Sequence, residues 1–135
     1  MVRTVVLPSS KKYQTMVLDT LLREACFARD GYKCIRCGKT ERLAPSHIYP
    51  KGSYRKMKYI LDNVKTLCYY CHMEFWHKNP IEAYEWLQTA ISKERLDHLR
   101  LCALVVDKTP FDFNAIKIIL EMAKKKFTSR LSDAT

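Results

Sequence analysis

Four cysteines in two pairs are the residues of this chain whose types and spacing most clearly define a chemistry. Cys34 and Cys37 form one Cys-x-x-Cys pair, and Cys68 and Cys71 form a second pair after 30 intervening residues. Thiolates are strong ligands for Zn²⁺, which structural sites bind with four ligands in tetrahedral geometry. Each pair supplies half of such a site, and Gly38 suits the tight turn of a zinc knuckle. The sequence therefore predicts one structural zinc ion.

Three further polar residues lie between and beside the cysteine pairs, and a zinc site needs none of them. They are His47, Asn63 and His72. A histidine can act as a general base near neutral pH, and a divalent cation can stabilise the leaving oxygen of a phosphodiester. The zinc knuckles would hold a short hairpin rigid, because so small a module buries little apolar surface by itself. This pattern indicates hydrolysis of a nucleic acid.

Residues 34–77 resemble the HNH (His–Asn–His, ββα-metal) endonucleases, in the version that carries a four-cysteine zinc site. The resemblance lies in the cysteine pairs and in the strings S-H-I-Y-P-K-G, D-N and L-C-Y-Y-C-H-M-E-F-W-H-K-N-P. These strings are also similar to phage HNH proteins, including recombination proteins of the NinG type. The resemblance covers about a third of the chain. It implies a DNA endonuclease that acts in a bacterial or phage-infected cell.

The resemblance also implies roles for single residues. His47 would be the general base, Asn63 would orient it, and His72 would bind a catalytic Mg²⁺ or Mn²⁺. The family usually has Asp before the base, but this chain has Ser46, a poor ligand for Mg²⁺ unless it binds through water. His77 is a further candidate ligand. On an ideal helix it points about 140° away from His72, so a shared ion requires a distorted helix.

The positive charge of the chain indicates a nucleic-acid partner. The formal net charge is +10, and residues 34–80 carry nine Lys/Arg against three Asp/Glu, whereas residues 81–135 carry nine against eight. Such a field attracts phosphates, and nothing in it suggests readout of base sequence. A flexible loop or a solvated basic surface remains the alternative. The residues predicted to contact DNA are Lys51, Arg55, Lys56, Lys58 and Lys65.

The expected fold is α+β and mostly helical, with a zinc-stapled ββα-metal core flanked by an N-terminal helix and C-terminal helices. Residues 1–33 form an arm with a short strand at 2–7 and a helix at 14–29, 34–80 form the nuclease module, and 81–135 form a helical extension. All three belong to one compact domain. Further elements are a strand at 42–48, helices at 72–78 and from 80 onward, and a last helix that begins at Thr109-Pro110. The apolar tract at 96–106 is either a buried helix or a helix plus a short strand. Cys26 and Cys102 are expected to be buried thiols.

Two functions of different classes follow. The first is a metal-dependent HNH endonuclease, and the alternative is a catalytically weak or inactive zinc module that only binds DNA. A protein-interaction domain that uses the helical tail is a third and weaker reading. No run of 18 apolar residues and no signal peptide is present, so we expect a cytoplasmic protein without a membrane partner. The oligomeric state stays open, with a homodimer as one possibility.

Overall fold

The structure, a computed structural model, describes residues 10–133 of the chain. The short strand expected at residues 2–7 lies outside this part. Short 3₁₀ turns occupy Arg55–Met57 and Leu61–Asn63. The longer elements, in chain order, are α1 (Lys11–Arg29), β1 (Leu43–His47), β2 (Val64–Cys68), a π-helical turn (Cys71–Trp76), α2 (Pro80–Ala90), α3 (Lys93–Leu104) and α4 (Phe113–Asp133).

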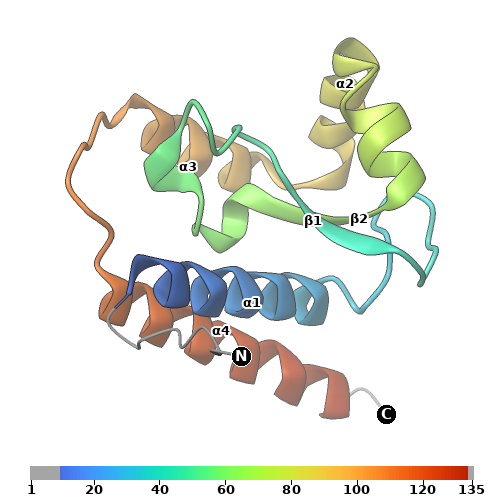
Figure 1. Cartoon of the computed structure of the whole chain (residues 1–135). Helices are drawn as coiled ribbons and strands as arrows, with labels where there is room; N and C mark the ends of the chain where they lie inside the picture. The colour runs from blue at the N-terminus through green and yellow to red at the C-terminus, as the bar shows by residue number, and fades with distance from the viewer. Residues whose placement is uncertain (1–9, 134–135) are drawn as a thin grey trace, which may run out of the picture.

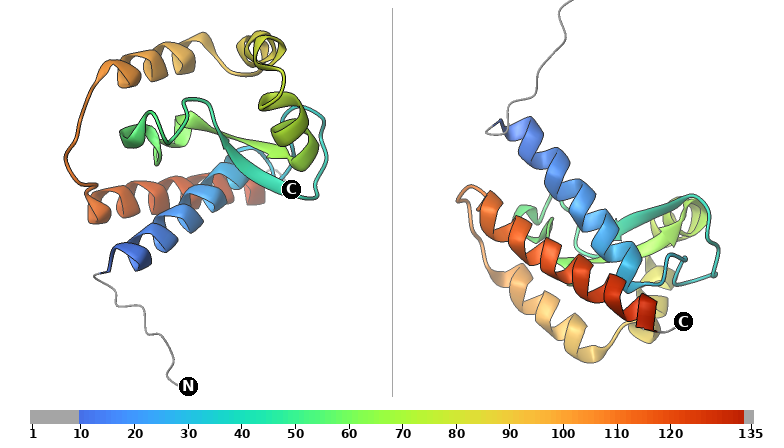
Figure 2. Two further views of the ribbon diagram at one scale, coloured as in Figure 1. Left: turned by 45° about the horizontal axis from the view of Figure 1, so that its top comes forward. Right: turned by 90° about the horizontal axis from the view of Figure 1, so that it is seen from below.

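A two-stranded antiparallel sheet of β1 and β2 lies between two groups of helices (Figures 1 and 2). Helices α1 and α4 lie side by side on one side of this hairpin, and α2 and α3 lie on the other side. The structure therefore confirms a mostly helical α+β fold. The last helix of the chain packs against the first one, so the two ends of the sequence form one layer.

The main apolar core joins this helical layer to the hairpin. The face of α1 predicted from its periodicity is buried, with Leu18, Leu22 and Ala25 each no more than 3% exposed. Val64 of β2 and Leu120 of α4 pack into the same cluster. Helices α1 and α4 and strand β2 thus share one apolar core.

The ends of α1 are set by capping groups on both sides. The Ser10 hydroxyl accepts a hydrogen bond from the backbone N–H of Tyr13 at 3.1 Å, which satisfies one of the free amides of the first turn. This cap starts the helix at Lys11, three residues before the predicted position. At the other end Gly31 has a φ of +76°, the left-handed conformation predicted for it.

Helix α2 begins at Pro80 as predicted, whereas the last two helices have other bounds than the sequence pattern predicted. Helix α4 begins at Phe113, because the Asp112 carboxylate accepts the N–H of Ala115 at 3.1 Å and so caps it. Thr109, the predicted cap, instead donates its hydroxyl to Asp107 at 2.6 Å. Most of the tract at 96–106 belongs to one helix, α3, which starts at Lys93 after the Ser92 cap, and the tract contains no strand. The expectation that it is buried is wrong, because Leu99 is the only buried residue of α3 and Leu104 and Val106 are 78% and 84% exposed.

Candidate metal centre and histidine site

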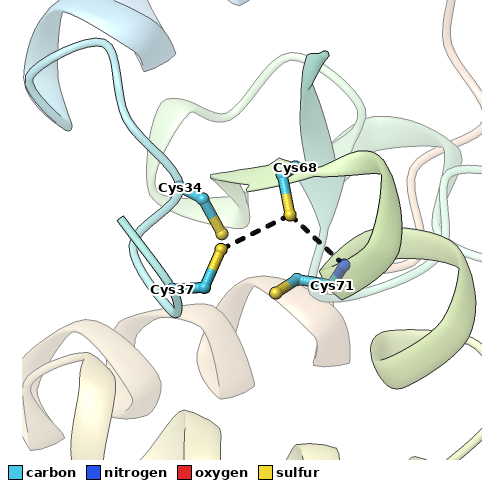
Figure 3. A group of neighbouring side chains, drawn as sticks. All are labelled: Cys34, Cys37, Cys68 and Cys71. Atoms are coloured by element: carbon cyan, nitrogen blue, oxygen red, sulfur yellow. Dashed lines mark hydrogen bonds between the residues drawn. The ribbon is translucent and has the colours of Figure 1, made fainter. Parts of the chain in front are cut away.

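The four cysteines of the two pairs converge at one end of the hairpin (Figure 3). Cys34 and Cys37 come from the loop after α1, Cys68 ends β2, and Cys71 begins the π-helical turn. Their four sulfur atoms all lie within 4.8 Å of one another. A tetrahedral zinc site with Zn–S bonds of 2.3 Å needs sulfur separations of about 3.8 Å, so small side-chain movements suffice to bind the ion. The cluster can hold a metal ion such as zinc.

Backbone hydrogen bonds alone already form the turn that holds the first cysteine pair. The N–H of Cys34 donates to the Lys39 carbonyl at 2.8 Å, and the N–H of Gly38 donates to the Cys34 carbonyl at 2.9 Å. Gly38 has a φ of +83°, which a residue with a side chain adopts only with strain. The N–H of Ile35 donates to Thr66 at 3.0 Å and so ties this knuckle to β2.

The electrostatics of the cluster favour a cation at its centre. Burial, together with the nearby thiols of Cys68 and Cys34, raises the pKa of the Cys71 thiol to about 12 against the opposing hydrogen bond from Arg36. For Cys34, backbone amides outweigh the effect of burial and lower the pKa to about 7. Several thiolates this close repel one another, and a bound divalent cation removes that repulsion. The donor set therefore fits a thiolate-preferring metal such as Zn²⁺.

His47 ends β1 and holds a fixed orientation. Its Nε2 lies 2.9 Å from the carbonyl oxygen of Lys58. A carbonyl only accepts hydrogen bonds, so Nε2 carries the proton and Nδ1 keeps a free lone pair. Burial lowers the pKa of His47, and the positive charges of Lys51, Lys65 and Lys58 lower it further against the opposing effect of the carbonyl. The imidazole is thus neutral at pH 7, the form that accepts a proton.

Asn63 is fully buried and supports His47 without touching it. Its Oδ1 accepts the N–H of Tyr49 at 2.8 Å, and its Nδ2 donates to the carbonyls of Tyr49 at 3.1 Å and Met57 at 3.0 Å. These bonds close the loop at 49–57. Lys58, whose carbonyl holds His47, follows that loop directly. Asn63 therefore holds the loop that precedes Lys58, whose carbonyl contacts His47.

His72 and His77 meet because the helix between them is a π-helix. The N–H of His77 donates to the His72 carbonyl at 3.2 Å, the i+5 pattern of that helix type. This widened turn places the two Nε2 atoms 3.0 Å apart, whereas an ideal α-helix would separate them. Burial lowers the pKa of His72, and the charges of His77, Lys65 and His47 lower it further. The neutral ring is the form that ligates a metal.

Ser46 and Lys65 are placed differently from their predicted roles. They face each other across the hairpin, and both are fully buried. The Lys65 amino group donates to the Ser46 hydroxyl at 3.1 Å and lies 3.2 Å from the centroid of the Trp76 ring. Burial, and to a lesser extent the charge of Arg95, hold the pKa of Lys65 well below its usual range. A fully buried amino group cannot contact the backbone of DNA, so the prediction for Lys65 is wrong. The Ser46 hydroxyl is buried and already bonded to Lys65, which argues against Ser46 as a metal ligand.

The remaining basic residues divide into two groups. Lys51 is exposed and, with Arg23 and Lys58, lines a cleft of about 310 Å³ into which His47 also opens. Arg55 and Lys56 instead bind the connection between α3 and α4. There Arg55 donates to the Thr109 carbonyl at 2.9 Å, and Lys56 forms an ion pair with Asp107 at 3.4 Å.

Sequence reasoning missed several residues beside these sites. Arg23 of α1 lies in the His47 cleft, and Asp19, one turn earlier, forms an ion pair with Lys58 at 3.5 Å. The i, i+4 spacing of these two charges on the polar face of α1 was the available signal. Cys26 is buried as predicted. Cys102 is partly exposed, and its Sγ lies 3.5 Å from Nε2 of His98.

Comparison of the chain with models of known protein families, with characterised proteins and with solved structures finds no match. The similarity to HNH endonucleases therefore rests on the residues quoted above. Among the residues that the structure describes, no helix is long and apolar enough to cross a membrane.

Proposed function

We propose that the protein is a metal-dependent DNA endonuclease whose site is similar to that of the HNH family. The observation that carries this proposal is the placement of His47. Its Nε2 is held by the Lys58 carbonyl, its Nδ1 is free, and its ring opens into a cleft beside Lys51 and Arg23. A neutral base next to groups that attract phosphate is what attack of water on a phosphodiester requires.

His47 and its neighbours act on the water and on the phosphate. Nδ1 of His47 takes a proton from a water molecule while the water oxygen bonds to phosphorus and the bond to the leaving oxygen breaks. The proton on Nε2 stays in its hydrogen bond to the Lys58 carbonyl, which keeps the ring in position as it becomes charged. Lys51 and Arg23 attract the phosphates on either side of the scissile bond. Asn63 keeps the loop that carries Lys58 in place.

His72 and His77 are the residues that would hold the catalytic ion. Their Nε2 atoms are 3.0 Å apart, and small rotations would let both bind one cation. Imidazole nitrogen suits Mn²⁺ and later transition metals better than Mg²⁺, which prefers oxygen ligands. When bound, the ion would stabilise charge that develops on the phosphate and the leaving oxygen. Of the two ions expected from the sequence, Mn²⁺ fits this pair better.

A second candidate is a zinc module that binds DNA without cutting it. The specific observation in its favour is the Ser46–Lys65 pair, because the position before His47 offers no carboxylate and its hydroxyl is buried against the Lys65 amino group. In this reading the cysteine cluster and the basic cleft keep their roles. His72 and His77 then contribute only to packing and to the surface.

A plasmid-nicking assay with Mn²⁺, Mg²⁺ or no added metal tests the proposal. We expect nicking with Mn²⁺, and His47→Ala should reduce its rate by about 10²- to 10⁴-fold, the usual contribution of a general base. His98→Ala is the matched control, because His98 is an exposed histidine on α3, away from the cleft. Cleavage that survives His47→Ala would refute the assignment of the base. Absence of cleavage with every metal would favour the binding module.

A further inference from the structure

A separate hollow is lined by residues of α2, α3 and the segment that follows β1. Helices α2 and α3 lie on the side of the hairpin away from α1 (Figure 1). Its volume is about 350 Å³, and neither the zinc cysteines nor His47 line it. Most of its wall is apolar or aromatic. The residues that matter for its chemistry are Ile48, Tyr49, Trp76, Tyr84, Leu87 and Arg100.

The aromatic wall of this hollow is more exposed than packing alone requires. The sequence pattern favours Tyr84 and Trp76 as packing residues, yet Tyr84 is 48% exposed on α2. Tyr49 and Trp76 are partly buried and line the same hollow. One face of Trp76 is covered by the Lys65 amino group and Tyr49 packs edge-on against Tyr54, so Tyr84 offers the most accessible ring of this wall. An accessible aromatic ring is a platform on which a nucleobase stacks, whatever the base.

The rim of the hollow carries positive charge. Arg100 is the one charged residue among the described residues that line it. Its guanidinium donates to the Tyr84 hydroxyl at 3.1 Å, and its other nitrogen lies 3.5 Å from Asp97, outside the hollow. The side chain is 54% exposed and can still reach an anion. An apolar floor with an arginine at the edge complements a base that is attached to a phosphate.

Two of the residues that line the hollow are sequence neighbours of the candidate catalytic histidines. Ile48 directly follows His47, and Trp76 directly precedes His77. The buried amide of Asn63 bonds to the backbone of Tyr49. The same bonds therefore fix Tyr49 in the aromatic wall and close the loop at 49–57.

We propose that the hollow bounded by Tyr49, Trp76, Tyr84 and Arg100 binds one unpaired nucleobase of a DNA strand, stacked on the aromatic wall with its phosphate at Arg100. This inference rests on the proposed action on DNA and refines its substrate to DNA with an extrahelical or single-stranded nucleotide. A fully paired duplex keeps its bases inside the stack and cannot fill the hollow without flipping a base out.

Binding measurements without added divalent metal test this inference separately from cleavage. The probes are a fluorescein-labelled duplex and the same duplex with one unpaired 2-aminopurine. We expect the duplex with the unpaired base to bind about 5- to 150-fold more tightly, which is the gain from stacking one base. Stacking on the aromatic wall should also quench the fluorescence of the 2-aminopurine. Tyr84→Ala should remove the preference and the quenching, whereas Tyr84→Phe should keep both. Arg100→Gln should lower the affinity for the probe with the unpaired base and leave the affinity for the fully paired duplex unchanged.

Tyr70→Ala is the matched control, because Tyr70 is an exposed tyrosine (58%) that lies outside the hollow. Equal affinity for the two probes, no binding of either, or a loss of preference in Tyr70→Ala as large as in Tyr84→Ala would overturn the inference. A change of oligomeric state in Tyr84→Ala with unchanged probe preference would assign the hollow to a protein contact instead. A preference for the unpaired base without nicking in any metal would leave the hollow assigned and reject the nuclease.

Discussion

The four-cysteine centre and the histidine site lie on the same short hairpin but are built in different ways. At one end, Leu43 pairs with Cys68 beside the cysteine cluster, and at the other His47 pairs with Val64. Three of the four cysteines are buried, and all four present the same ligand atom. The histidine site combines a fixed ring, a π-helical pair and an exposed cleft from separate segments.

The difference lies in what each site needs in order to exist. The cysteine centre needs only two tight turns brought together, and the bound metal would itself supply much of the folding free energy of that end. The histidine site gains no such energy and depends on the surrounding fold. We therefore expect changes at the cysteines to affect the whole domain, and changes at the histidines to affect chemistry with the fold intact.

The strongest test of this contrast is removal of one thiolate. Cys68→Ser should abolish stoichiometric zinc and unfold the domain, because apparent zinc-binding free energies in small structural sites reach about 10–16 kcal/mol. Elemental analysis and circular dichroism measure the two effects. Cys102→Ser is the control, since Cys102 lies outside the cluster and should keep both zinc and fold. Purified wild-type protein without zinc would contradict the prediction.

A substitution at Asp30, which ties the end of α1 to β2, should destabilise the cysteine centre and the histidine site to the same extent. The Asp30 carboxylate accepts the Thr66 N–H of β2 at 2.9 Å and the Arg29 guanidinium at 2.9 Å. Asp30→Asn should lower the free energy of unfolding by about 1.5–3 kcal/mol, the worth of charge-assisted hydrogen bonds. Denaturant unfolding of the zinc-loaded protein measures this loss. Unchanged stability at pH 7 would show that the carboxylate contributes nothing.

The same substitution has a predictable pH dependence. Burial raises the pKa of Asp30, but the bonds to Arg29 and Thr66 outweigh it and hold that pKa below its ordinary value. The stabilisation is therefore complete above the pKa of an unfolded Asp, near 3.9, and is lost as the pH falls through the lower folded value. The difference in stability between wild type and Asp30→Asn should shrink in that acidic range, and a difference independent of pH would exclude this cause.

Loss of His77 should leave the fold intact and weaken only the binding of Mn²⁺ at the His72–His77 pair. His77→Ala should reduce Mn²⁺ affinity by about 10- to 100-fold, since even residues behind a ligand often contribute that much. Zinc content and thermal stability should stay at the wild-type values. Titration followed by the Mn²⁺ electron paramagnetic resonance signal gives the affinity. His98→Ala should bind Mn²⁺ as the wild type does, and equal affinity in all three proteins would reject the histidine pair as a site.

The smallest expected effect separates an accessible lysine from a buried one. Lys51→Ala should reduce the slope of log affinity for duplex DNA against log salt by about 0.9, the value of one phosphate contact. Lys65→Met should leave that slope unchanged, because its amino group is fully buried against Ser46 and Trp76. Fluorescence anisotropy between low and moderate salt measures both slopes. A reduced slope in Lys65→Met alone would reverse the assignment.

The sequence by itself determined the features that depend on local chemistry. Two Cys-x-x-Cys pairs can close on one ion wherever the chain brings them together, and their spacing therefore predicted the cluster in advance. The buried face of α1 followed in the same way from the repeat of Leu18, Leu22 and Ala25, and the stop at Gly31 followed from its missing side chain.

Only the tertiary structure decided which polar groups are free to act. Lys65 and Lys51 are both lysines in a basic stretch, but β2 is covered on both faces, so Lys65 is buried and Lys51 remains in the cleft. His72 and His77 meet because a π-helix replaces the α-helix that their spacing implies. Burial and helix type depend on what packs against a segment from elsewhere in the chain, and no local pattern of residues carries that information.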